Sequence, residues 1–116
     1  PDRGREAALS LLRLPDPPTC ILMPDDYACL GALEAASELG LRVPEDLSLG
    51  GYDGMRLAQH IRPRLTTIAQ NASQIGMLAA RRLVDAIECA PPKEPWTTTV
   101  PGQLLAGESM GPISHA

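Results

Sequence analysis

The stretch from residue 19 to residue 40 constrains the fold most strongly, because a strand pattern changes into a helix pattern across one short turn. A short apolar run, Cys20–Met23, ends at Pro24, which cannot donate a hydrogen bond to a sheet ladder. From Tyr27 to Leu39 the chain is rich in Ala and Leu, and Gly40 supplies a typical helix stop. This order predicts a strand, a tight turn and a helix.

Two acidic residues, Asp25 and Asp26, fill the turn between that strand and that helix. Asp is a favoured N-cap residue, and we assign the cap to Asp26. Ligands of open α/β sheets meet such turns at the carboxyl ends of the strands. Asp25 therefore either fills a solvated turn or contacts a small polar ligand, and the local sequence leaves both interpretations open.

The rest of the chain alternates between helix and strand patterns. Helices are predicted over residues 5–14, 27–39 and 73–88, with Ser73 as the cap of the last one. Strands are predicted over residues 20–23, 47–52, 65–68 and, broken by Pro101-Gly102, over 96–100 and 103–106, with a short helical segment over 55–61. This alternation predicts an α/β fold with an open parallel sheet.

Polar residues follow three successive predicted strands: Asp25 after the first, Asp53 after the second and Gln70 after the third. Gly50 and Gly51, near the end of the second strand, allow another group to approach the backbone closely. Because parallel strands end at the same edge of a sheet, we expect a ligand site there.

Composition excludes several classes of function. The 116 residues make one small domain, and 10 basic against 14 acidic residues give a net charge of −4, which disfavours nucleic-acid binding by this chain itself. No apolar run has the length of a membrane-spanning helix, and no export signal is evident. No catalytic residue is assigned, because there is no GxSxG motif and His60 has no evident nucleophile partner.

The three cysteines, Cys20, Cys29 and Cys89, are odd in number and form no CxxC motif. Cys20 and Cys29 are expected to be small buried side chains in a reducing compartment. No Cys or His residues have metal-ligand spacing, so neither a metal site nor another cofactor is expected.

One helix face combines charge with exposed apolar residues. Tyr27 and Leu30 share the wet stripe of the helix over residues 27–39 with Glu34. Two apolar residues beside charged ones suggest a contact with another protein.

Several blocks together carry a family resemblance. They are Pro24-Asp25-Asp26 with Leu30-Gly31-Ala32, the run from Glu38 to Ser48, Gly51-Tyr52-Asp53, the run from Pro63 to Gln70, and Glu108-Ser109. In this order and spacing, the chain from Gly4 to Ser109 resembles the lactose-repressor and galactose-repressor (LacI/GalR) family of bacterial transcription regulators.

The resemblance implies a type I periplasmic-binding-protein-like fold, a three-layer open parallel sheet of which this chain is a partial lobe. Residues 1–109 would be the C-terminal part of the effector domain, with the helix over 72–88 packing toward a first lobe outside this chain and residues 110–116 forming a disordered tail. The intact protein would be a cytoplasmic homodimer. Its helix-turn-helix head, also outside this chain, would bind operator DNA under the control of a small sugar-like effector.

The resemblance also assigns residues. Asp53 matches the cleft aspartate that binds effector hydroxyls, Gln70 a polar position near the hinge, and Asp25 a position where the family usually has Asn. Ionised Asp only accepts hydrogen bonds, so this departure suits a ligand that offers donors. Gly107 stands where the family commonly has Arg. The expected dimer surface comprises Tyr27, Leu30, Leu33, Glu34, Arg56, Leu57 and His60.

Two other classes share part of this pattern. A periplasmic sugar-binding component of a transport system has the same fold and would carry an export signal. A phosphoacceptor receiver domain also places acidic residues after strands, but it needs a lysine after the last strand, and the only lysine here is Lys93 in a proline-rich loop. The repressor-like motif blocks favour the regulator.

Overall fold

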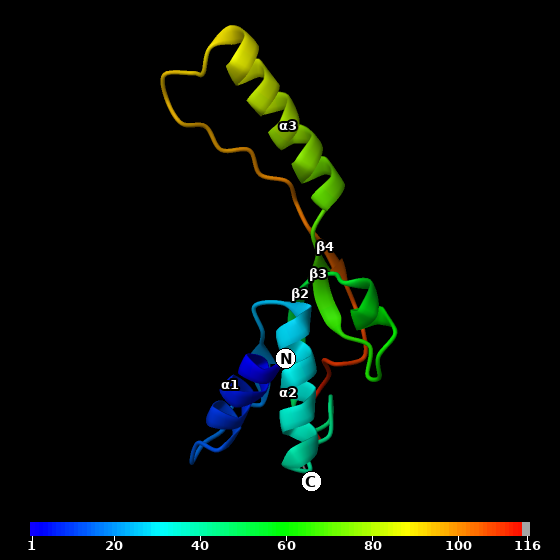
Figure 1. Cartoon of the computed structure of the whole chain (residues 1–116). Coiled ribbons are helices and arrows are strands. Elements are labelled where there is room, and N and C mark those ends of the chain that lie inside the picture. Colours follow the sequence, from blue (N-terminus) through cyan, green and yellow to red (C-terminus); the bar gives the residue numbers. More distant parts are fainter. Residues whose placement is uncertain (115–116) are drawn as a thin grey trace. The chain divides into compact units, whose positions relative to one another are not determined.

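The computed structural model describes residues 1–114, and its elements alternate as the sequence predicts. Figure 1 shows their course along the chain. The elements are α1 (Asp2–Leu12), β1 (Cys20–Leu22), α2 (Asp26–Glu38), β2 (Ser48–Asp53), the 3-10 helix η1 (Arg56–Gln59), β3 (Thr66–Ala69), α3 (Ala72–Cys89) and β4 (Gln103–Leu105).

The strands form one sheet in the order β1-β2-β3-β4. β1 pairs with β2 in parallel, with Leu22 opposite Gly50, and β2 pairs with β3 in parallel, with Asp53 opposite Ala69. The predicted parallel α/β sheet is therefore confirmed. Parallel pairing brings the carboxyl ends of β1, β2 and β3 to the same edge.

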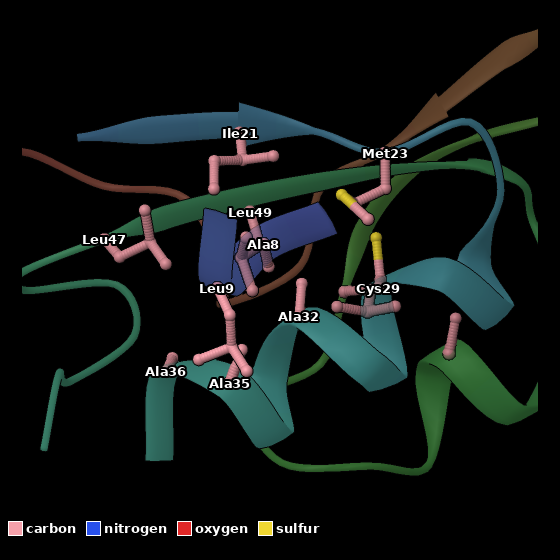
Figure 2. Close-up of a cluster of buried hydrophobic side chains, with 12 residues drawn as sticks. Ala8, Leu9, Ile21, Met23, Cys29, Ala32, Ala35, Ala36, Leu47 and Leu49 are labelled. Carbon is pink, nitrogen blue, oxygen red and sulfur yellow. The ribbon is translucent and has the colours of Figure 1, made fainter. Parts of the chain in front are cut away.

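The core lies between one face of the sheet and the helices. Figure 2 shows Ile21 of β1 and Leu49 of β2 facing the small side chains of α2, among them Ala32 and Ala35. Both alanines are completely buried. Alanine side chains let the helix backbone approach the strands closely, which explains how a chain without Phe closes a core.

Within the first unit (residues 1–69 with the chain from Leu104 onward), the opposite face of the sheet carries exposed apolar side chains. Leu22 is 75% exposed and Leu104 is 62% exposed. In the first unit, the buried apolar cluster thus lies on one face of this sheet. Cys20 also lies exposed, which corrects the prediction of a buried side chain: only Ile21 of β1 points toward the helices. Cys29 is buried as predicted.

Helices α1 and α2 cross at glycines. A Cβ atom on Gly4 would crowd the backbone of Ala28, and one on Gly31 would meet the Arg5 nitrogen at 2.5 Å. The crossing is closed by an ion pair in which Arg5 Nη2 donates to Glu38 Oε2 at 2.8 Å. Glu38 of α2 therefore contacts α1.

A late segment of the chain is bound into the sheet by Ser109. This completely buried hydroxyl donates to the Leu49 carbonyl oxygen at 2.6 Å and accepts from the Thr66 amide at 2.9 Å. The Leu49 amide in turn donates to the Ser109 carbonyl oxygen at 2.8 Å. Ser109 thus joins β2 to the start of β3.

Residues 110–114 depart from the predicted disordered tail. The Gly111 amide donates to Ser48 Oγ at 3.1 Å, and the Ser114 amide donates to the Glu45 carbonyl oxygen at 2.9 Å. Hydrogen bonds donated by its backbone amides hold this segment. Residues 115–116 lie outside the described residues.

Gly107 and Glu108 contact the segment before β3. Glu108 accepts hydrogen bonds from the backbone amide of Arg64 at 3.0 Å and from its Nε at 3.1 Å. A Cβ on Gly107 would meet the Leu65 carbonyl carbon at 2.5 Å. A side chain at position 107, such as the Arg common in the resembled family, would require a different backbone path here.

The chain divides into two compact units. The first comprises residues 1–69 with the chain from Leu104 onward, and the second comprises residues 70–103. Within the second unit, the Arg82 guanidinium lies 5.0 Å from the centre of the Trp96 ring, but no residue of α3 is buried. Among the described residues, no helix is both long enough and apolar enough to span a membrane.

Two predictions in the second unit are wrong. The N-cap of α3 is Asn71, whose side chain accepts from the Gln74 amide at 3.1 Å, rather than Ser73. Asn71 stands directly before the first helical residue, where a cap must stand. Residues 96–100 form no strand, whereas Gln103–Leu105 further along does. Only Gln103–Leu105 pairs.

Candidate functional site

Asp25 is the N-cap of α2, which corrects the assignment of that cap to Asp26. Its backbone is extended, and its Oδ1 accepts from the Ala28 amide at 2.6 Å. The half-buried Asp25 borders a cavity of about 300 Å³ whose lining also includes Arg3 and Tyr27. The cap uses one carboxylate oxygen and presents the carboxyl group at the carboxyl end of β1.

Asp26 instead turns into the protein and is only 2% exposed. Its Oδ2 accepts from the Met55 amide at 2.7 Å, and its Oδ1 accepts from Thr67 Oγ1 at 2.6 Å. Gly51 makes room for this carboxylate, because a Cβ on Gly51 would crowd Asp26 Oδ1. The glycine pair in the second predicted strand was the sequence signal for this close approach, but the sequence did not identify Asp26 or Thr67 as the approaching partners.

Asp53 ends β2 in an unusual backbone conformation, with φ of 108°. Side chains other than Gly rarely adopt positive φ, and such residues are enriched at binding sites. The following residue, Gly54, also has positive φ, and a Cβ there would meet the Ala69 Cα at 2.5 Å. The exposed Asp53 carboxylate is thus carried by a tightly built turn at the carboxyl edge.

The parallel pairing brings Asp53, the last residue of β2, and Asp25, which follows β1, to the same edge of the sheet. Gln70 directly follows Ala69, the register partner of Asp53, and begins the second unit. Asp25, Asp53 and Gln70 therefore lie at or just after the carboxyl ends of three neighbouring strands.

The carboxyl edge is acidic, and its negative charge affects the pKa of the buried Cys29 thiol. Burial first, and then the negative charges of Asp26 and Asp25, raise the pKa of Cys29 from 9.0 to about 12. The thiol donates toward the Gly50 carbonyl oxygen at 3.4 Å. Chemically, this edge can accept hydrogen bonds from a polar ligand and favours ligands that carry donors or positive charge.

Within residues 1–114, no three His, Cys, Asp or Glu side chains gather in a way that could hold a metal ion. The expected dimer residues lie on α2 and around η1 in the first unit. Tyr27 is 51% exposed and Leu57 44% exposed, whereas Leu33 packs partly against the core. Of the other expected members, Glu34, Arg56 and His60 are exposed and Leu30 is half-buried.

Residues 2–110 match the family profile of the periplasmic binding protein-like domain. The chain belongs to this family. Its relatives are repressors: over 87 residues it is 45% identical to the HTH-type transcriptional repressor CytR of Escherichia coli K12 and 44% identical to the repressor PurR of Escherichia coli O139:H28. It is thus part of a LacI/GalR-type effector domain. Each alignment covers 75% of this chain and 26% of the repressor, so the chain spans about a quarter of the length of these relatives.

Solved structures of the LacI family have the same fold as this domain. A LacI family regulator from Arthrobacter sp. FB24, in complex with lactose, superposes with a TM-score of 0.80 at 34% identity over 95% of this chain and 42% of the regulator. The lac repressor dimer bound to operator and the anti-inducer ONPF gives a TM-score of 0.82 at 29% identity over 92% of this chain and 37% of the repressor. A regulator from Enterococcus faecium with bound ribose gives 0.78 at 29% identity, over 96% of this chain and 40% of the regulator.

Proposed function

We propose that this chain is the effector-binding and dimerisation portion of a bacterial LacI-type transcriptional regulator. It binds a small, polar, sugar-like ligand at the carboxyl edge of the sheet and needs neither a cofactor nor a metal for this. Ligand binding controls operator binding by a helix-turn-helix head that this chain does not contain. The regulator acts in the cytoplasm, where its DNA target is.

The observation that carries this proposal is the conformation of Asp53. An exposed carboxylate at positive φ, at the end of a central parallel strand, supports direct contact with ligand hydroxyl groups. The lactose and ribose complexes among the solved relatives support sugars as the ligand class. Gln70 contributes a second polar contact from the segment after β3.

Asp25 adjusts the ligand preference. Its Oδ1 accepts from the Ala28 amide, an arrangement that Asn can reproduce as an N-cap. The charge of Asp25 is therefore not required for the helix, and we assign it to ligand selection. Such a carboxylate prefers a ligand with an amino group or outward hydroxyl donors.

Dimerisation places two copies of α2 and η1 against each other about a two-fold axis, the commonest symmetry of oligomers. The exposed side chains of Tyr27 and Leu57 support this surface. In the intact regulator, α3 packs toward a first lobe with the apolar side chains that are exposed here, such as Leu83 and Ile87.

The proposal is tested with the full-length product of the gene that encodes this chain. A panel of mono- and disaccharides, including ribose, lactose and their amino derivatives, is screened by thermal shift, and hits are measured by calorimetry. We expect amino sugars to bind more tightly than their neutral parents, and Asp25→Asn to remove this preference while leaving the melting temperature near that of the wild type.

Asp53→Asn should weaken binding of the best sugar by about 1.5–3 kcal/mol, the scale of a hydrogen bond to a charged group. Ser10→Ala, on the exposed face of α1, serves as the control and should leave affinity unchanged. An Asp53→Asn protein with wild-type affinity would contradict the assignment of Asp53. A panel in which no sugar raises the melting temperature would contradict the ligand class.

A further inference from the structure

The turn that carries Asp53 is held by hydrogen bonds that its backbone amides donate to two buried side chains. Thr67, which is 1% exposed, accepts through Oγ1 from the Gly54 amide at 3.3 Å. The same hydroxyl donates to Asp26 Oδ1 at 2.6 Å, while Asp26 Oδ2 accepts from the Met55 amide at 2.7 Å. One hydroxyl and one carboxylate thus bind both amides that follow Asp53.

Burying the Asp26 carboxylate costs free energy, so its hydrogen bonds call for an explanation. Asp26 is 2% exposed, and a carboxylate at that depth is tolerated only with good hydrogen-bond donors around it. The Asp26 side chain also occupies space that any side chain on residue 51 would need. Capping of α2 does not explain why Asp26 is buried, because Asp25 already caps this helix.

The backbone conformation of the turn explains what the contacts do. Asp53 has φ of 108° and Gly54 has φ of 69°. A non-glycine residue persists in such a conformation only where the surrounding structure determines it. The Gly54 and Met55 amides are the points at which Thr67 and Asp26 hold this turn.

We infer that Asp26 and Thr67 are positioning residues for effector recognition, which fix the turn so that Asp53 stands at the carboxyl edge ready for the ligand. This inference rests on the proposed function of Asp53. Asp26 begins α2, and Met55 directly precedes η1. The same carboxylate therefore links the Asp53 turn to both elements of the expected dimer surface.

The test uses the full-length gene product and three substitutions. Thr67→Val removes the hydroxyl with little change of shape, Thr67→Ser restores it, and Asp26→Asn keeps the shape but changes the acceptors. Thr97→Val, at an exposed threonine outside this cluster, is the matched control. Residue-resolved hydrogen exchange is measured at the Gly54 and Met55 amides and at reference amides in β1, and affinity is measured by calorimetry with the tightest sugar of the panel above.

We expect Thr67→Val and Asp26→Asn to accelerate exchange at Gly54 and Met55 by about tenfold, because each substitution removes or weakens a hydrogen bond to the buried Asp26 carboxylate. Exchange in β1 should stay unchanged, and sugar affinity should fall by a similar factor. Thr67→Ser should behave as the wild type in both measurements, because its hydroxyl makes the same contacts. Thr97→Val should change neither.

Other outcomes overturn the inference. Unchanged exchange at Gly54 and Met55 in Thr67→Val would show that the hydroxyl does not hold the turn. Equal acceleration throughout the chain would reveal general destabilisation instead of positioning. If Asp53→Asn weakens sugar binding but Thr67→Val does not, the inference fails while the proposed function stands; if Asp53→Asn has no effect, the proposed function fails first.

Discussion

At the scale of single residues, the buried thiol of Cys29 shows how the acidic carboxyl edge acts on its neighbours. Burial, followed by the charges of Asp26 and Asp25, raises the pKa of Cys29 to about 12. The thiolate is the reactive form of cysteine, so Cys29 remains inert in the folded protein at neutral pH.

We predict that iodoacetamide at pH 8 modifies the exposed Cys89 in the native protein but leaves Cys29 unmodified, as read by peptide mass spectrometry. Guanidinium should make both cysteines equally reactive. Equal labelling under native conditions would contradict this.

The raised pKa of Cys29 also makes the stability of the protein depend on pH. Between pH 9 and about 12 the unfolded chain loses this proton and the folded chain keeps it, so stability falls as pH rises, and Cys29→Ala should flatten that fall.

The adjacent aspartates mark the limit of sequence reasoning at this scale. The sequence placed both Asp25 and Asp26 in a turn at the end of a strand, and the structure agrees. Their roles were exchanged, because a one-residue difference in the helix start decides which side chain caps α2 and which turns inward. The partners of Asp26, Thr67 and Met55, come from distant parts of the chain. No local pattern encodes such contacts.

At the scale of elements, the crossing of α1 and α2 depends on Gly4 and Gly31. Each glycine lies so close to the other helix that an added Cβ would overlap with its backbone. Helix propensity alone favours Ala over Gly by about 1 kcal/mol, but overpacking costs about 1–3 kcal/mol. The steric cost should therefore prevail here, because backbone atoms cannot move aside as a flexible side chain can.

We predict that Gly31→Ala lowers the free energy of unfolding of the full-length product by about 1–3 kcal/mol in urea titrations. Ser37→Ala, at an exposed position of the same helix, is the control and should change it by less than about 0.5 kcal/mol. A Gly31→Ala protein as stable as the wild type would mean that the helices separate without cost.

Element types were predictable, but their ends and one element were not. Alternating strand and helix patterns, with Pro24 and Gly40 as stops, correctly predicted the parallel sheet. The cap of α3 was placed at Ser73 instead of Asn71, because both are good cap residues within one turn. The run Trp96–Val100 has strand composition, yet a strand forms only beside a partner, and composition does not reveal a partner.

At the scale of the whole molecule, much apolar surface lies uncovered in the described residues. The side chains of Leu22 and Leu104 are exposed on one face of the sheet, and those of Leu83 and Ile87 are exposed on α3. Apolar surfaces of this kind usually mark contacts with other chain segments or other proteins. The stretch aligned with the repressor CytR is 26% of that protein, so this relative has further chain outside the matching region. The exposure of these apolar side chains could not be predicted from the sequence, because burial also depends on what lies outside the chain.

We predict that the full-length product sediments as a dimer and that Leu57→Asp, on η1, shifts it toward monomer. A charge introduced into a buried apolar interface remains unpaired, which costs several kcal/mol, and a stable dimer buries at least about 1,000 Å². Leu11→Asp, on the exposed side of α1, is the matched control and should leave the dimer intact. A Leu57→Asp protein that still sediments as a dimer would place the interface elsewhere.

The binding of Ser109 between β2 and β3 also sets the order in which this lobe matures during synthesis. β2 and β3 leave the ribosome well before Ser109, so the Leu49 and Thr66 amides emerge without the partner they have in the finished fold. Until that serine emerges, we expect these amides to bond to water beside an exposed apolar face, the kind of surface that chaperones bind. The β2–β3 pair therefore gains its full set of hydrogen bonds only after a serine 43 residues beyond Thr66 has been made.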